Sequence, residues 1–186
     1  MNMNKKIWIA LAVVVVLIIY GFSTYNRLIS TNEAVDGQWA QVETQYQRRF
    51  DLIPQLVNSV KGILKQENAV FGEIADARTR YSGASGSNDK AKAASQMEGA
   101  LGRLLVIVEN YPQLKSSENV SVLMAQLEGT ENRVSVERSR FNDSVKAYNL
   151  SVKRFPSSII ASMGNFAERS YFEAASGTEK APEVNL

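Results

Sequence analysis

The chain contains no cysteine and no histidine among its 186 residues. The first absence excludes disulfides, thiol nucleophiles and sulfur-ligated metal sites. The second removes the commonest metal ligand and the commonest general base. A strong charge of one sign is also missing: the formal net charge is +2 at pH 7, which gives no broad electrostatic attraction for nucleic acid. We therefore expect no enzyme activity, no cofactor, no metal ion and no nucleic-acid partner.

Charge is missing altogether from the run IWIALAVVVVLIIYGF at residues 7–22. Extended to Tyr25, this run makes about nineteen residues and roughly 28 Å of helix, enough to cross the hydrocarbon core of a bilayer. Trp8 lies near one end and Tyr20 with Tyr25 near the other, as in the aromatic belts of membrane proteins. The sequence therefore predicts a transmembrane helix at residues 7–25, preceded by a short flank at residues 1–6.

The flanks of this run bear on two further questions. Lys5 and Lys6 also suit the start of a cleaved signal peptide, but residues 21–23 fit a cleavage site poorly, which favours a retained anchor. Only Arg27 follows closely behind the run, where Glu33 and Asp36 oppose it. The positive-inside rule then favours a cytoplasmic N-terminus, with the rest of the chain periplasmic or extracellular.

Apolar residues recur at helical spacing after the anchor. The first stripe comprises Leu28, Val35, Trp39, Val42, Tyr46, Phe50, Ile53, Val57, Val60 and Leu64. Pro54 interrupts it, predicting either a kink or a break after which Asp51 would cap a restarted helix.

Three more helical patterns follow. One runs from Val70 to Tyr81, one from Lys90 to Tyr111, and one in near-heptad register through Leu123, Leu127, Val134, Phe141, Val145, Tyr148, Val152 and Phe155. The glycine- and serine-rich stretch at residues 82–89 predicts a loop, and Pro112 and Pro156 end the second and third patterns. No strand hairpin is indicated, so the fold class is all-α.

The lengths of these patterns fit an antiparallel up-and-down four-helix bundle at residues 26–156 if the chain turns near residues 66–68. The alternative is three long helices, the first running unbroken from the membrane to Tyr81.

Several long motifs make the chain resemble the LemA family. They are QWAQVETQYQRRFDLIPQLVNSVKG, NYPQLKSSEN, QLEGTENRVSVERSRFNDSVKAYN and RFPSSIIA followed by YFEA, and together they extend the resemblance to about Ala175. This resemblance implies a bacterial protein with one N-terminal span and an α-helical bundle. Together with the predicted single span, it leads us to expect the chain in the bacterial inner membrane.

The motifs contain aromatic and charged residues. Helical spacing favours a core role for Trp39, Tyr46, Phe50, Leu127, Val134, Phe141, Tyr148 and also Phe155. The charged signature comprises Arg48, Arg49, Asp51, Glu128, Glu131, Arg133, Glu137 and Arg138, and the polar Asn132 lies with Glu131 beside the core positions. The signature fits either partly buried ion pairs that fix helix register or a site for a charged partner, and we favour the first. A di-metal centre of the bundle type would require histidine.

The segment at residues 157–175 offers the apolar residues Ile159, Ile160, Met163, Phe166, Tyr171 and Phe172. They either pack on the end of the bundle or meet the membrane surface or a neighbouring protein. Arg169 is the only basic residue there, which favours a protein contact over electrostatic capture of lipid. The tail at residues 176–186 is polar and predicted to be flexible, and its terminal Leu186 is a candidate for capture by a partner.

Three functions follow. The first, which we favour, is a non-catalytic, membrane-anchored scaffold that assembles with itself or with another envelope protein. The second is an adaptor that presents its C-terminal tail to a membrane protease or stress-response partner. The third is an enzyme using Asp51, Glu128 or Glu131, which would require these carboxylates to converge in a cleft.

Overall fold

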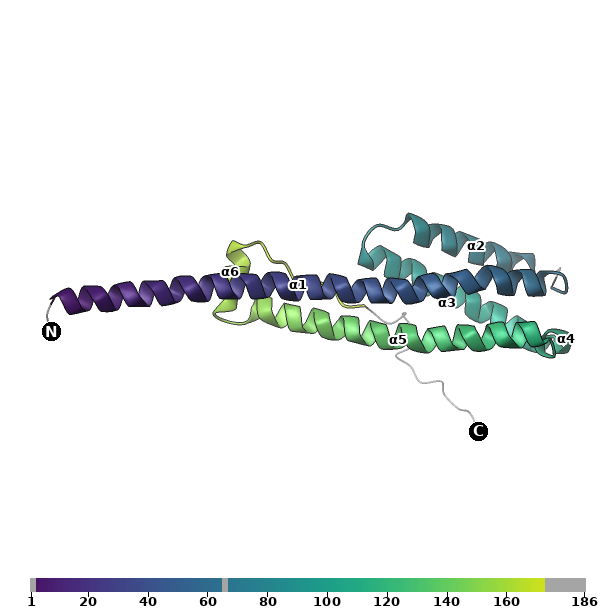
Figure 1. Ribbon diagram of the computed structural model, residues 1–186. Helices are drawn as coiled ribbons and strands as arrows, with labels where there is room; N and C mark the ends of the chain where they lie inside the picture. Colours follow the sequence, from purple (N-terminus) through teal and green to yellow (C-terminus); the bar gives the residue numbers. More distant parts are fainter. Residues whose placement is uncertain (1–2, 65–66, 173–186) are drawn as a thin grey trace, which may run out of the picture. The chain divides into compact units, whose positions relative to one another are not determined.

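The computed structural model describes residues 3–64 and 67–172, with side chains from Lys6 onward. Within these ranges all regular structure is helical, which confirms the all-α class. The helices are α1 (Met3–Lys61), α2 (Asn68–Gly83), α3 (Ser87–Asn110), α4 (Pro112–Lys115), α5 (Glu118–Lys153) and α6 (Ser157–Met163) (Figure 1). Leu186 and the predicted tail lie outside the described residues.

Helix α1 is 59 residues long and contains the uncharged run. Among the described residues it is the one helix long and apolar enough to cross a membrane, and the apolar window is fully exposed. The helix continues through Pro54, so of the two alternatives predicted there, a kink or a break, the break is wrong. Asp51 accordingly caps nothing and instead accepts a hydrogen bond from the Gln47 side-chain amide at 3.0 Å.

Proline is tolerated within α1 because neighbouring residues hold the helix from the packed side. Phe50, Ile53 and Leu56 are all buried and compensate for the backbone hydrogen bond that Pro54 cannot make. Helix α1 ends at Lys61, and α2 starts at Asn68. The alternative of one unbroken helix to Tyr81 is therefore wrong.

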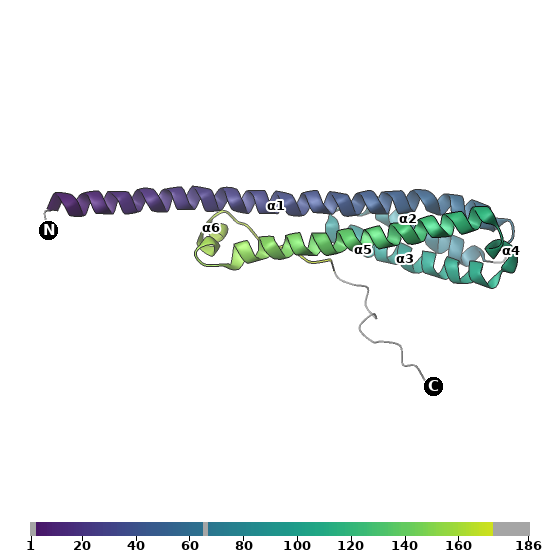
Figure 2. The same ribbon diagram turned by 60° about the horizontal axis from the view of Figure 1, so that its bottom comes forward.

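Helices α2 and α3 pack against each other along their length (Figure 2). The loop between them is confined to residues 84–86, because α2 continues through Gly83 and α3 begins at Ser87. It is shorter than the stretch 82–89 that composition suggested. Gly86 adopts a φ of +84°, a left-handed conformation that glycine enters without a Cβ penalty.

The described chain divides into two compact units. The first joins the residues up to Gln38 with Arg140–Tyr171, and the second joins Trp39–Ser139 with Phe172. Helices α1 and α5 each contribute to both. The second unit also contains α2, α3 and α4, and the first contains α6.

The second unit has a continuous apolar core. The core residues are Trp39, Val42, Tyr46, Phe50, Ile53, Leu56 and Val60 from α1, Leu64 from the connection after α1, Val70, Ile74 and Ala77 from α2, Met97, Leu101, Leu104 and Val108 from α3, and Val120, Leu127 and Val134 from α5. Leu56 is fully buried, whereas Val57, which the stripe predicted, is half-buried. Steps of three from Ile53 to Leu56 and of four to Val60 keep the stripe facing inward, and Val57 lies beside it.

The first unit buries Leu28 and Val35 of α1 and Ala161 of α6. Helix α5 contributes Phe141, Val145 and Tyr148 to it. Phe155, predicted as a core residue, is 81% exposed. Helix α5 stops at Lys153, so Phe155 no longer follows the helical face that carries Tyr148.

Candidate functional site

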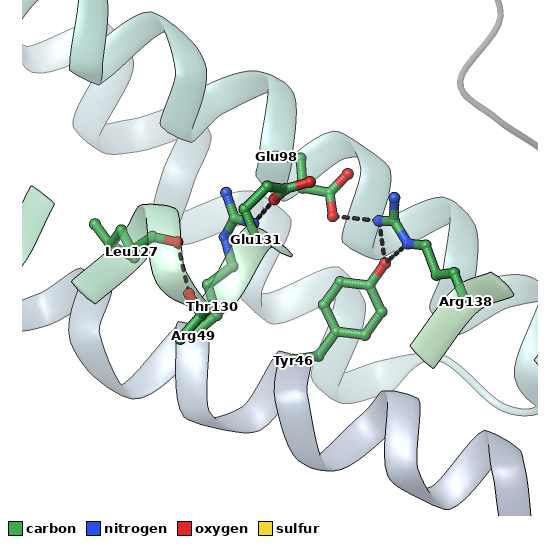
Figure 3. Close-up of polar contacts among 7 residues, drawn as sticks. All are labelled: Tyr46, Arg49, Glu98, Leu127, Thr130, Glu131 and Arg138. Carbon is green, nitrogen blue, oxygen red and sulfur yellow. Dashed lines mark hydrogen bonds and ion pairs between the residues drawn. The ribbon is translucent and has the colours of Figure 1, made fainter. Parts of the chain in front are cut away.

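A network of charged and phenolic side chains lies inside the second unit, among α1, α3 and α5 (Figure 3). Its members are Tyr46, Arg49, Glu98, Glu131 and Arg138, and beside them the buried Thr130 hydroxyl donates to the carbonyl of Leu127 at 2.7 Å. Tyr46 and Arg49 are three residues apart on α1 and so point to the same side of the helix. They lie within the buried stripe of that helix, whose other members in the second unit are apolar. The network is thus a polar insertion in an apolar core.

Arg138 of α5 is its central cation. Its Nε donates to the Tyr46 hydroxyl at 2.9 Å, while its Nη2 contacts that hydroxyl and also pairs with the Glu98 carboxylate of α3. The guanidinium also lies over the Phe172 ring, 4.5 Å from the ring centroid. Arg138 of α5 therefore contacts α1, α3 and Phe172 at once.

Arg49 of α1 is only 6% exposed and forms an ion pair with Glu131 of α5. Burial lowers its pKa, and the nearby Glu98 carboxylate opposes this effect. Its Nε and the Oε1 of Gln45 have no hydrogen-bond partner within the described residues. Because the Glu131 side chain is 42% exposed, the pair lies at the edge of the core and extends into it.

Burial in the second unit also shifts the pKa of two tyrosine side chains, Tyr46 and Tyr81. Burial raises the pKa of Tyr46, reinforced by Glu98 and opposed by Arg138. Burial also raises the pKa of Tyr81 of α2 to about 12, with a further contribution from Glu43. The Tyr81 ring meets Phe50 edge-on, with 4.6 Å between ring centroids. Burial thus extends the pH range over which both phenols stay neutral above that of a free tyrosine.

In this arrangement, two arginines face two carboxylates and a neutral hydroxyl. Each group is oriented toward another side chain of the network, so the groups fix the helices that carry them. Two further ion pairs, from Lys90 to Glu43 and from Arg103 to Glu73, connect α3 with α1 and α2. No group of three or more acidic residues that could hold a metal ion occurs in the described part of the chain.

In the first unit, the non-helical segment after α6 returns along α5. The Tyr148 hydroxyl donates to the carbonyl of Ala167 at 2.9 Å. Asn149 exchanges two hydrogen bonds with the backbone of Arg169, each 2.9 Å long. Arg169 itself pairs with Asp36 of α1. Side chains of both long helices thus hold the segment in place.

The apolar residues predicted to meet a partner separate into two groups. Ile159 and Met163 of α6 are 52% and 78% exposed, and Tyr171 is also exposed. The half-buried members pack internally: Ile160 faces Gly21 of α1, Phe166 meets the Tyr25 ring edge-on, and Phe172 stacks on Trp39.

The match to known proteins covers both of these regions. The family model described as the LemA family matches residues 38–186, which include the network and the C-terminal segment. The chain belongs to the LemA family. This confirms the resemblance that the motifs predicted.

Curated relatives of this LemA-family chain are magnetosome proteins by name. It is 25% identical to Magnetosome protein MamQ 1 and to MamQ 2 of Paramagnetospirillum magneticum, over 195 residues that cover 88% of this chain and 72% of each relative. It is 26% identical to Magnetosome protein MamQ of Magnetospirillum gryphiswaldense over 174 residues, which cover 80% of this chain and 64% of that relative.

Only some residues of the charged LemA signature enter the polar network. Arg49, Glu131 and Arg138 enter the network, and Glu137 is half-buried beside it. The other predicted register residues, Arg48, Asp51, Glu128, Asn132 and Arg133, are exposed.

Sequence reasoning missed Glu98 and assigned Tyr46 only an apolar role. The available signal was position: Glu98 lies four residues after Ala94 and three before Leu101, both of which are buried. A carboxylate at such a spacing falls on the packed face of an α-helix.

Proposed function

We propose that this LemA-family chain is a non-catalytic, single-pass membrane-anchored scaffold of the bacterial inner membrane. Residues 7–25 form the anchor, the N-terminus is cytoplasmic, and α1, α2, α3 and α5 form an up-and-down four-helix bundle. The exposed apolar run of α1 supports the anchor. The charge asymmetry around that run supports the orientation.

The bundle is supported by the polar network. Arg138 connects α5 to α1 and α3, and the ion pair between Arg49 and Glu131 connects α1 to α5 a second time. Each bond requires one relative register of the helices that it joins, because a shift by one turn would move its partners about 5 Å apart. Buried polar groups of this kind are known to specify helix pairing and register.

We further propose that copies of the chain assemble in the plane of the membrane through α6. The observation that carries this proposal is the exposure of Ile159 and Met163, which occupy one side of α6 four residues apart. The Ile160 side chain between them contacts α1 at Gly21, within the anchor. The exposed side of α6 is therefore presented beside the bilayer, where confinement of all copies to one surface raises their effective concentration.

The mass of the intact protein in a mild detergent tests this assembly. We expect a discrete homo-oligomer for the natural chain and a monomer for the double variant Ile159→Ser, Met163→Ser. The matched control is Val106→Ser, Val122→Ser, which removes two similarly exposed apolar side chains from the second unit and leaves the oligomer intact. These point variants are sharper than truncation before Pro156, which would also delete the hydrogen bonds to Tyr148 and Asn149.

A monomeric natural chain, or an oligomer that persists in the α6 variant, would refute assembly through α6. In the first case, the adaptor hypothesis takes its place, and the tail at residues 176–186 becomes the segment to delete in a search for a partner.

A further inference from the structure

The first unit contains a cleft of about 460 Å³ between α1 and the end of α5. Its lining includes the aromatic side chains of Tyr20 of α1 and Phe155 after α5. It also includes two basic residues, Arg27 and Arg154, and hydroxyl groups such as those of Ser23 and Ser157. A cleft lined by both apolar and cationic side chains offers the two kinds of contact that a phospholipid requires, one for its acyl chains and one for its headgroup phosphate.

The two arginines have no acidic partner within the described residues, and no carboxylate lines the cleft. The neighbouring basic residue Lys153 differs in this respect, because it pairs with Glu168 at 2.8 Å. Both arginines are exposed, and both remain charged under all physiological conditions. Their guanidinium groups are therefore available for the phosphate of a ligand, for which planar bidentate donors are well suited.

The depth of the cleft along α1 identifies a membrane lipid as the source of that phosphate. Arg27 is the first charged residue after the apolar run. Gly21, on which Ile160 of α6 packs, lies six residues earlier, which is about 9 Å along the helix. This places α6 at the depth where interfacial helices lie in a bilayer and Arg27 at the level of the headgroups.

The sequence around α6 supports the same placement. Between Arg154 and Glu168, no residue is charged. This uncharged stretch carries the exposed side chains of Phe155, Ile159 and Met163. Two uncharged segments, one from α1 and one from residues 155–167, therefore lie side by side, and each is bordered by an arginine at the same cleft.

We propose that this cleft binds one phospholipid, with Arg27 and Arg154 holding its headgroup phosphate and Tyr20 with Phe155 contacting its acyl chain. The site rests on the membrane anchor proposed above but does not depend on self-assembly. It differs from the expectation that residues 157–175 engage a protein rather than lipid, because the two arginines lie just before that segment and on α1.

Native mass spectrometry of the full chain, titrated with phosphatidylglycerol in a mild detergent, tests the site. We expect one lipid to be retained by the natural chain. The double variant Arg27→Gln, Arg154→Gln should weaken the apparent Kd at least about tenfold, since each cation near an anionic headgroup contributes severalfold to binding. The lysine pair Arg27→Lys, Arg154→Lys should retain part of the affinity.

The control is Arg78→Gln, Arg133→Gln, which removes the same charge from exposed positions of the second unit. Unchanged lipid retention in the Arg27, Arg154 variant would overturn the proposal, as would an equal loss in the control. Displacement of the lipid by millimolar inorganic phosphate would also overturn it by showing a site for free phosphate.

Flotation with phosphatidylglycerol vesicles separates this site from the anchor. The Arg27→Gln, Arg154→Gln variant should still float, because α1 keeps its apolar run. A natural chain that fails to float would refute the anchor itself, and with it the assignment of a lipid to the cleft.

Discussion

Arg49 places a full charge in the packed stripe of α1, beside the buried side chains of Tyr46, Phe50 and Ile53. The adjacent Arg48 points away and is exposed. These two consecutive arginines therefore differ in how far water reaches their charged groups. One is solvated and contributes little to stability, and the other is withdrawn from water and depends on its partner.

We therefore expect Arg49→Gln to lower the free energy of unfolding by about 2 kcal/mol, because Glu131 loses its partner and a neutral glutamine at the buried position cannot replace the ion pair. The value is below that of a fully buried pair, since Glu131 is partly solvated. Urea denaturation of the full chain in detergent, followed by far-UV circular dichroism, measures it. Arg48→Gln is the control and should change stability by less than about 0.5 kcal/mol. Equal effects at the two positions would contradict a structural role for the buried pair.

Tyr81 should make stability fall at alkaline pH. Its pKa is raised to about 12 by burial and by Glu43, whereas the phenol of the unfolded chain titrates near 10. The folded chain thus binds more protons between these values, so this contribution is intact below about pH 10 and is lost as the pH rises toward 12. Between pH 9 and 11.5 the natural chain should lose about 1–2 kcal/mol more than Tyr81→Phe.

Denaturation at several pH values, with phenolate absorbance recorded in parallel, measures this difference. Tyr171→Phe removes an exposed phenol and is the matched control. If Tyr81→Phe and the natural chain lost stability in parallel, the raised pKa would not be the cause.

The sequence predicted at residue scale which positions of α1 and α5 face inward, but it did not predict how their polar groups pair. The bond from Arg138 to Tyr46 joins positions 92 residues apart, and that from Arg138 to Glu98 joins positions 40 apart. Helical periodicity assigns each residue to a face of its own helix. It contains no information on which residue of another helix lies opposite, and this depends on register.

Among the elements, the segment after α6 shows how side chains can order a chain that has no regular structure. Residues 164–172 are not helical, yet Asn149 of α5 satisfies both the N–H and the carbonyl of Arg169. An asparagine amide is suited to this because it donates and accepts at once. Its side chain is buried, so the two bonds are shielded from competing water.

Asn149→Ala should release this segment locally without unfolding α5. We expect trypsin to cleave after Arg169 about tenfold faster, because loss of two hydrogen bonds favours the locally open state that a protease requires. Mass spectrometry of the peptide that begins at Ser170 follows the reaction. Asn132→Ala, an exposed change on the same helix, is the control and should leave the rate unaltered. An unchanged rate in Asn149→Ala would show that the ion pair between Arg169 and Asp36 is sufficient.

The sequence predicted the long helices but not the short helix α6. The long helices were recognised from their stripes, since each buries an apolar face over many turns. Helix α6 was not, because its seven residues are too few to show a period and its packing depends on Gly21 of a distant helix. Phe155 was misassigned for a related reason: the heptad pattern continues through Arg154 in sequence while the helix does not.

On the scale of the whole molecule, a single helix, α1, contains both the proposed membrane anchor and residues of the polar network. It is one helix from the apolar run to Lys61, and no loop separates the predicted anchor from the residues that enter the network. Its first part exposes apolar side chains, and its later part buries them. Such a change along a single helix is expected where the solvent changes from lipid to water and packed protein.

The orientation of this helix can be tested directly because the chain has no cysteine of its own. Asn4→Cys places a thiol before the apolar run, and Ser85→Cys places one in the loop between α2 and α3. With a cytoplasmic N-terminus, a membrane-impermeant maleimide should label Ser85→Cys in intact spheroplasts and Asn4→Cys only after permeabilisation. The natural chain should remain unlabelled in both conditions. The reverse pattern would invert the orientation and assign the bundle to the cytoplasm. Labelling of both variants in intact spheroplasts would show that residues 7–25 do not separate two compartments, so a single-pass anchor would be excluded.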